Sequence, residues 1–173
     1  MMKIVKTILV GIGATLAIDC FTFIVSLFGN TPRGILFLGR WIAYMPKGKF
    51  FHHTIIETPS IANELIIGQI AHYSIGIVFA FLLVVIYGKK WLVNPRLFPT
   101  IIIAFITLIP PIFILHPALG FGIAFSNMPM PGLLLLKIYL IHMVYGLGLY
   151  LSAKIIQCIS NVSRKDLGKQ LEN

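Results

Sequence analysis

Residues 61–87 decide the fold, and they read IANELIIGQIAHYSIGIVFAFLLVVIY. Between Leu65 and Tyr87 this stretch contains no Asp, Glu, Lys or Arg. A helix that crosses the hydrocarbon core of a bilayer needs about 20 predominantly apolar residues, and this stretch is long enough. Its apolar residues do not alternate with polar ones as they would in a barrel strand, so the pattern predicts a transmembrane helix.

Three further apolar stretches of similar length lie on either side, and the four predicted spans cover residues 7–28, 61–87, 97–115 and 133–156. Turn residues or charges separate them. The third span is the weakest, because Pro110 and Pro111 interrupt it and should kink or break the helix. Since the backbone inside a bilayer must satisfy its own hydrogen bonds, we predict an all-α integral membrane protein with one membrane domain, residues 1–173.

The composition agrees with this class. The chain is 58% hydrophobic and only 11% charged, whereas soluble domains contain roughly 25% charged residues. The net charge of +9 would suggest nucleic acid in a soluble protein. Here the basic residues flank the apolar stretches, so we interpret them as topology signals and expect the lipid bilayer, not nucleic acid, as the partner.

The distribution of Lys and Arg predicts the orientation. With the N-terminus inside, the cytoplasmic side has the larger share of basic residues, nine against five: Lys3, Lys6, Lys89, Lys90, Arg96, Lys154, Arg164, Lys165 and Lys169 against Arg33, Arg40, Lys47, Lys49 and Lys137. The positive-inside rule therefore places both ends of the chain in the cytoplasm, including a polar tail at residues 161–173.

Both outer segments have unusual sequences. In the first, Thr31-Pro32 is a helix-start signal, Pro46 is a stop, and residues 34–45 between them are nearly all apolar but too short to span. We expect an interfacial or re-entrant helix there, with Arg40 and Trp41 at the level of the lipid headgroups. The second outer segment, residues 116–132, is uncharged and rich in Gly and Pro, which predicts backbone that packs back against the bundle as an embedded segment.

Three ionisable residues fall at one depth inside the predicted spans. Counted from the outer ends of their spans, Asp19, His72 and His142 each lie about 14–17 Å below the surface, close to the middle of a core about 30 Å thick. Such side chains are costly in a bilayer unless they contact one another or water. Small or polar residues at helical spacing surround them, so we add Thr15, Tyr73, Gly76, Gly146 and Tyr150 as neighbours of a central polar site.

Several roles for this site remain open at this stage. Buried Asp and His side chains can simply lock helices together through hydrogen bonds. They can also form a path for protons or ions. Asp19, His72 and His142 match the ligand types of a transition-metal site with two histidines and one carboxylate, and the two histidines alone could be axial ligands of a haem.

A second polar group is predicted at the outer mouth of the bundle and comprises Arg40, His53, Glu57, Glu64 and His116. It could be an external metal or substrate mouth. The plainer interpretation is a wet interfacial helix around His53 and Glu57, with Glu64 favourably placed in the first turn of the second span. The outer basic residues, Arg40 among them, would most simply contact lipid phosphates.

The chain resembles the bacterial membrane proteins grouped as domain-of-unknown-function family 2938. The resemblance runs from about residue 11 to residue 152 and rests on these positions: Ala14-Thr15 with Asp19, Gly39-Arg40-Trp41, Gly48 with Phe50, Ala71-His72-Tyr73 with Gly76, Gly120, Gly122, Ala124, Ser126, Pro129, Pro131, His142, Gly146 and Tyr150. It implies a bacterial inner-membrane location and no particular activity.

No nucleophile elbow, P-loop, dinucleotide fingerprint or HExxH motif is present, so nothing in the sequence supports an enzyme. The expected function is transport or permeation of a small solute or ion through the Asp/His site. The alternatives are a haem- or metal-binding redox subunit and a structural partner in a membrane complex, as a homo-oligomer or with another protein.

Overall fold

A computed structural model describes residues 2–29 and 33–171, which form helices and connecting loops with no strand among them. Four helices are long and apolar enough to cross a membrane: Lys3–Ser26, Glu64–Tyr87, Leu97–Ala118 and Pro131–Asn161. The prediction of an all-helical protein with four spans is confirmed, and the chain is a multi-pass membrane protein. The helix-start signal at Thr31-Pro32 lies outside the described residues.

The elements in chain order are α1 (Met2–Ser26), α2 (Gly34–Tyr44), η1 (Met45–Lys47), α3 (Glu64–Tyr87), α4 (Leu97–Thr107), the π-helical turn η2 (Pro111–Leu115), α5 (His116–Ala118), η3 (Ile123–Phe125) and α6 (Pro131–Leu171). Two bounds differ clearly from the prediction. The first helix begins five residues before Thr7. The last helix continues to Leu171, through most of the segment that we had assigned to a polar tail, while residues 172–173 lie outside the description.

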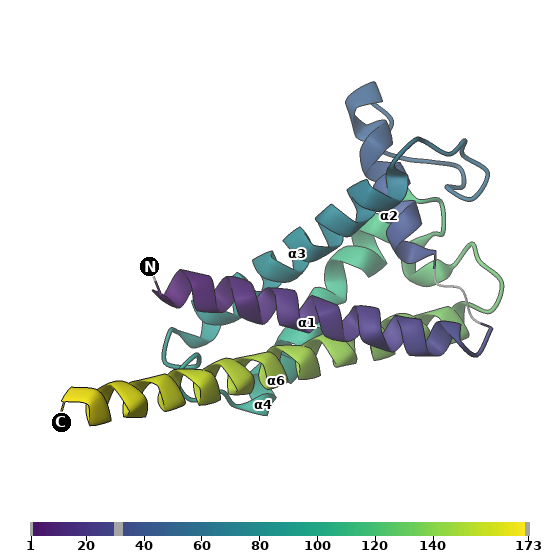
Figure 1. Ribbon diagram of the computed structural model, residues 1–173. Coiled ribbons are helices and arrows are strands. Elements are labelled where there is room, and N and C mark those ends of the chain that lie inside the picture. Colours follow the sequence, from purple (N-terminus) through teal and green to yellow (C-terminus); the bar gives the residue numbers. More distant parts are fainter. Residues whose placement is uncertain (1, 30–32, 172–173) are drawn as a thin grey trace.

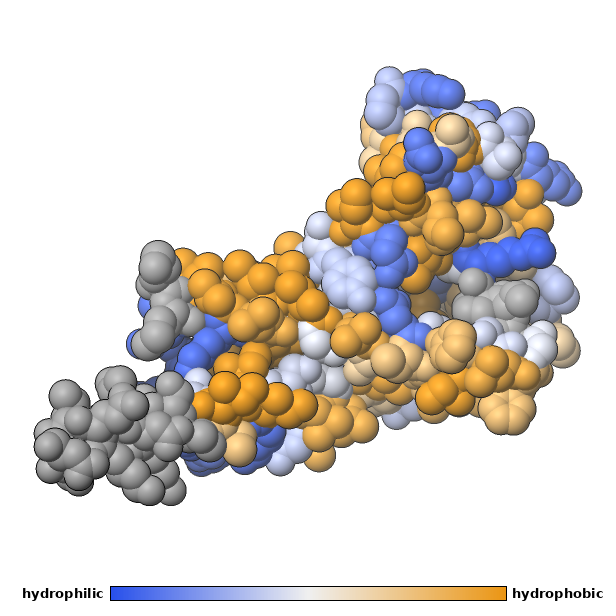
Figure 2. All heavy atoms as spheres, in the orientation of Figure 1, coloured by the Kyte–Doolittle hydropathy of each residue, from blue (hydrophilic) through white to orange (hydrophobic). Residues whose placement is uncertain are grey.

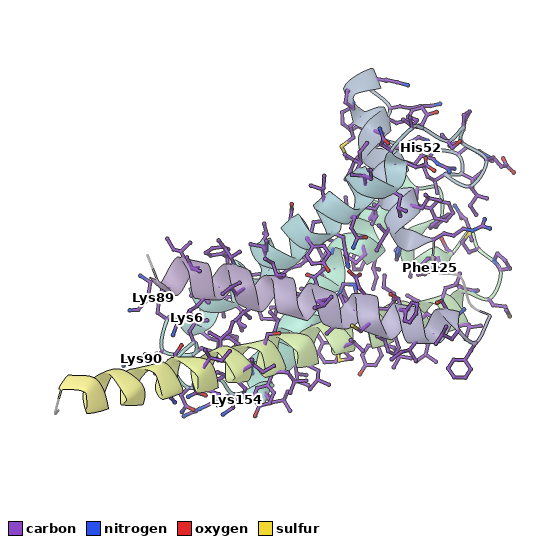
Figure 3. All side chains as sticks on the ribbon, in the orientation of Figure 1. Lys6, His52, Lys89, Lys90, Phe125 and Lys154 are labelled. Carbon is purple, nitrogen blue, oxygen red and sulfur yellow. The ribbon has the colours of Figure 1, made fainter. Side chains whose placement is uncertain are left out.

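The four spans are arranged around α1 and α6, which run side by side (Figure 1). Helix α3 packs against α1 near its C-terminal half and diverges from α1 and α6 toward its N-terminus, where α2 lies against it. Helix α1 begins and α6 ends at the same end of the bundle, which we call the terminal end (Figure 1). Lys6, Lys89, Lys90 and Lys154 lie there (Figure 3).

Small residues bring the spans close together. A Cβ atom at Gly11 of α1 would lie 2.7 Å from the Cα of Ile77 in α3, and one at Gly148 of α6 would lie 2.9 Å from the Cα of Ala14 in α1. Real side chains do not fit at such distances, so the glycines permit these crossings. The apolar core that results includes Val10, Ala14, Leu83, Ile103, Tyr145 and Leu149.

The third span is interrupted where the two prolines predicted it. Helix α4 ends at Thr107, and the chain continues through Pro110 into the π-helical turn η2, whose closing bond runs from the backbone N–H of His116 to the carbonyl of Pro111. Proline lacks the N–H that a regular helix requires, and a π-helical turn is one way for a helix to absorb the mismatch.

At the end opposite the termini, α2, residues 45–63 and residues 116–130 form what we call the distal lobe. The backbone N–H groups of His52 and Ile55 donate to the carbonyls of Ala118 and Leu119, which ties the two outer segments together. Ile55, Leu119, Phe121 and Phe125 form its buried apolar core. The helix predicted in the first outer segment is present over Gly34–Tyr44; its depth, and that of the second outer segment, in a bilayer stays a prediction.

Candidate functional site

Asp19 is the centre of a hydrogen-bonded cluster between α1 and α3. Its Oδ2 atom accepts hydrogen bonds from Gln69 Nε2 at 3.0 Å and from the Tyr73 hydroxyl at 2.8 Å. Its Oδ1 atom lies 3.3 Å from His72 Nε2. The three partners sit at positions i, i+3 and i+4 of α3, so they share one face of that helix. The depth argument therefore brought Asp19 and His72 together correctly.

The contact between Asp19 and His72 requires a hydrogen on one of the two facing atoms. His72 Nε2 has no hydrogen-bond partner in the described structure, and a bare nitrogen lone pair 3.3 Å from a carboxylate oxygen would be repelled by it. A proton on either atom removes the repulsion, because the imidazole nitrogen or the carboxyl group then becomes a donor. A neutral His72 with its ring hydrogen on Nε2 meets this requirement, so the contact favours that tautomer.

This cluster is only partly enclosed. The side chains of His72 and Asp19 keep 19% and 24% of their surface exposed. Figure 2 shows hydrophilic side chains on this face in the angle between α1 and α3, within an otherwise apolar surface. The carboxylate is therefore not fully enclosed by the protein.

His142 makes its contact elsewhere in the bundle. Its Nδ1 atom lies 2.8 Å from the hydroxyl of Thr107 in α4. Since the Thr107 hydroxyl donates its single hydrogen to the carbonyl of Ala104 at 2.7 Å, the Nδ1–H of His142 must be the donor to Thr107. In the neutral ring Nε2 then has the free lone pair, so the partner of His142 fixes its tautomer.

The three predicted metal ligands do not form one set. Among the residues described, no group of three His, Cys, Asp or Glu side chains is arranged to hold a metal ion. The predicted neighbours are also divided. Tyr73 binds Asp19 directly, and Thr15 packs against Gly76, where a Cβ would overlap its hydroxyl oxygen.

Two other predicted neighbours lie on α6 and serve different contacts. Gly146 allows α6 to approach α4, since a Cβ there would lie 2.8 Å from the carbonyl oxygen of Thr100. The ring centroid of Tyr150 lies 5.8 Å from the ammonium group of Lys154. Neither residue contributes a hydrogen bond to the Asp19 cluster described above.

Arg40 is buried in protein, so the expectation that it contacts lipid phosphates is wrong, while its level in a bilayer stays a prediction. Its Nε and Nη2 atoms bind the two carboxylate oxygens of Glu64, each at 2.8 Å. Its Nη1 atom donates to the carbonyls of Ile55 and Thr58. The hydrogen bond to Glu64 raises the pKa of Arg40 above its ordinary value, so this ion pair stays charged and joins α2, α3 and the loop between them.

The rest of the predicted outer mouth is not the helix we expected. Residues 48–63 form turns and loop, in which Lys49, His53 and Glu57 line a shallow depression of about 250 Å³ together with His52, Thr54, Thr58 and Pro59. Burial lowers the pKa of His52, and the charge of Lys49 lowers it further.

His116 does not line an open mouth either. It is buried, with its ring centroid 3.9 Å from that of Phe125 and its Nδ1 atom without a partner in the described structure. The five residues of the predicted mouth thus divide into an ion pair, two loop residues and a buried histidine.

Sequence reasoning missed Gln69 and Thr107. Gln69 carried a usable signal, because it lies one turn before both His72 and Tyr73 on the same helical face. Thr107 carried none, since a threonine in an apolar helix usually bonds its own preceding turn. Only the packing of α4 against α6 shows that it also positions a histidine.

Comparison with known proteins gives one match. A family model described as "Protein of unknown function (DUF2938)" matches residues 8–156, and this range contains Asp19, His72 and His142. No curated protein and no solved structure matches the chain.

Proposed function

Because the chain belongs to the DUF2938 family, whose function is unknown, we propose that it moves a small solute or ion across a bacterial inner membrane, with both ends in the cytoplasm and Asp19 as the central binding group. The observation that carries the proposal is the Asp19 cluster. A carboxylate inside a membrane span, held by donors from a second span yet a quarter exposed, is the arrangement expected of a permeation site.

The shape of the bundle supports the same function. Helix α3 diverges from α1 and α6 toward the distal lobe (Figure 1). The partners of Asp19 on α3 lie nearer to that lobe along the helix than Gly76, where α3 crosses Thr15 of α1 closely. The apolar core below the cluster closes the bundle toward the terminal end through Val10, Leu83 and Leu149. A path that is open on one side of a polar site and closed on the other is what alternating access requires.

The test is flux into vesicles. The purified protein would be reconstituted into liposomes, and the entry of H⁺, Na⁺, K⁺, NH₄⁺ and glycerol followed by internal dyes or light scattering. We expect wild-type vesicles to admit at least one of these faster than empty vesicles, and Asp19→Asn to lower that rate by about tenfold or more. Glu57→Gln is the matched control, because Glu57 is an exposed carboxylate in the distal lobe.

Two results would contradict the proposal: wild-type vesicles that behave as empty ones for every probe, or an Asp19→Asn rate equal to wild type. A structural role for Asp19 is the main alternative, because its hydrogen bonds also join α1 to α3. A double-mutant cycle of Asp19→Asn with His72→Ala measures that part, and we expect a coupling above about 0.5 kcal/mol in thermal unfolding. The structural role alone predicts lower stability with an unchanged rate per folded molecule.

A further inference from the structure

We infer that the depression in the distal lobe binds the headgroup of a zwitterionic phospholipid with a primary amine, which is the chemistry of phosphatidylethanolamine. This inference goes beyond the proposed function and does not rest on it, because the depression and the Asp19 cluster share no residue. The depression has a volume of about 250 Å³, below the roughly 300–1,000 Å³ of pockets for drug-sized ligands. Its size therefore suits a headgroup.

The first argument is the charge of the depression. Lys49 supplies an ammonium group and Glu57 a carboxylate, and both residues are exposed. Neither has an ion-pair partner among the residues that the structure describes. A phosphate at Lys49 and a primary ammonium at Glu57 would each gain a charge-assisted hydrogen bond. A headgroup with both charges therefore fits better than an anionic one, which would leave the carboxylate of Glu57 uncompensated.

The second argument is that the depression is held in shape by the protein. The ring centroid of Tyr44, the last residue of α2, lies 5.5 Å from Nζ of Lys49 and 5.3 Å from the ring centroid of His52. The Tyr44 hydroxyl donates to the carbonyl of Pro59 at 3.0 Å. The Nδ1 atom of His52, which is buried in the lobe (Figure 3), lies 3.1 Å from the hydroxyl of Thr58. Both ends of the lining loop are thus tied to one side chain, so little ordering would be needed on binding.

The third argument is the position of the depression next to the start of a span. The carbonyl of Thr58, which lines the depression, and the carboxylate of Glu64 bind the same guanidinium group, that of Arg40. Glu64 is the first residue of the second candidate membrane span. The depression therefore lies beside the point where a span begins, and lipid headgroups are found at that level of a bilayer.

The fourth argument is the apolar surface of the same loop. Phe50, Phe51 and Ile56 are 52%, 74% and 48% exposed, and in the sequence they lie between residues that line the depression. Figure 2 shows hydrophobic and hydrophilic side chains next to one another on the distal lobe. Lipid chains would cover such apolar groups, whereas a soluble phosphate compound would leave them in water. The loop therefore favours a lipid as the source of the headgroup.

The experiment measures lipid retention by native mass spectrometry. The purified protein in detergent is incubated with equal amounts of dioleoyl phosphatidylethanolamine, phosphatidylglycerol and phosphatidylcholine, which have the same acyl chains and differ only in the headgroup. We expect wild type to retain phosphatidylethanolamine about threefold or more over each of the others, which is the size of effect that an exposed charge pair produces. Phosphatidylcholine has no N–H group for Glu57, and phosphatidylglycerol has no cation.

Substitutions at the two charged residues test the site directly. Lys49→Gln should lower the retention of phosphatidylethanolamine about threefold, and Glu57→Gln should abolish its preference over phosphatidylcholine. Lys47→Gln is the matched control, because Lys47 lies 5.0 Å from the same Tyr44 ring centroid and does not line the depression. It should retain lipid as wild type does. In the flux assay Glu57→Gln should keep the wild-type rate, because the two sites are separate.

Three outcomes would overturn the inference. The first is equal retention of the three lipids by wild type, or a preference for phosphatidylglycerol. The second is unchanged retention in Lys49→Gln. The third concerns the source of the headgroup: if free phosphoethanolamine displaces phosphatidylethanolamine at a matching concentration, the acyl chains contribute nothing and the occupant is not a lipid. None of these results changes the expected flux of Asp19→Asn, so the proposed function would still stand.

Discussion

At the scale of single residues, the ion pair of Arg40 and Glu64 is the shorter of the two in the described structure. Both side chains are 9% exposed, and all of the guanidinium nitrogens have partners. Two charges removed from water are stabilising only with such complete hydrogen bonding, so the loss of one partner leaves the other as an uncompensated buried charge.

Replacing Arg40 by Gln should therefore destabilise the protein by about 3–5 kcal/mol. Arg33→Gln is the control, because Arg33 is exposed, and it should change stability by less than about 0.5 kcal/mol. Thermal unfolding in detergent measures both. The double variant Arg40→Gln with Glu64→Gln should be more stable than Arg40→Gln alone, since no unpaired charge remains. If the double variant is less stable than Arg40→Gln alone, an unpaired Glu64 charge is not the cause of the destabilisation.

The sequence predicted a contact between two residues where their depth in neighbouring helices is enough to decide it. Asp19 and His72 meet because they lie at one level on helices that touch. His142 was predicted at the same depth, but its Nδ1 atom contacts Thr107 of α4 instead. The pairing of Arg40 with Glu64 could not be predicted, because it requires α2 to fold back onto α3. Contacts between residues far apart in the sequence decide that arrangement.

At the scale of elements, the approach of α2 to α3 depends on two glycines. A Cβ atom at Gly39 would overlap the carbonyl oxygen of Glu64, and one at Gly68 would overlap that of Ile35. The backbones of the two helices are thus in direct contact, which is how Arg40 reaches Glu64.

Gly39→Ala should force the helices apart and destabilise the protein by about 1–3 kcal/mol. Gly34 is the matched control: it lies in the same helix, and among the described residues no packed atom lies within 4 Å of a Cβ built there. Gly34→Ala should therefore be neutral or slightly stabilising, because alanine is the better helix former. Thermal unfolding of the two variants provides the comparison, and equal effects would mean that the close crossing is not required.

The elements were predictable to different degrees. Long apolar stretches predicted the four spans, and Pro110-Pro111 predicted the break in the third, because hydropathy and proline geometry act locally. The helix expected around His53 and Glu57 does not form. There, backbone bonds to residues 118 and 119 hold the loop, and such long-range bonds leave no periodic signal in the sequence.

At the scale of the whole molecule, the arrangement of the ends and of the basic residues makes one topology favourable. Helix α1 begins and α6 ends at the terminal end, where Lys6, Lys89, Lys90 and Lys154 gather (Figure 3). From the positive-inside rule we predict that this end faces the cytoplasm.

Reporter fusions check this orientation directly. Fusions after Lys90 and at the C-terminus should be active as cytoplasmic reporters, whereas fusions near Lys47 and near Asn127 should be active as periplasmic ones. As a control, each site is fused to two reporters, one that is active only in the cytoplasm and one that is active only in the periplasm. If the two sets of signals are exchanged, the distal lobe faces the cytoplasm and the orientation is inverted.

The ion pair in the distal lobe also bears on how the chain is made. Arg40 leaves the ribosome 24 residues before Glu64, so during synthesis there is an interval in which α2 exists and its counter-charge does not. Until Glu64 follows, the guanidinium has no carboxylate partner, so we expect the nascent α2 to stay where water or lipid phosphates can solvate that charge. Glu64 is the first residue of α3, so the same event that starts the second span also lets α2 settle into the lobe. The position of Glu64 therefore sets the point in synthesis at which α2 can be buried.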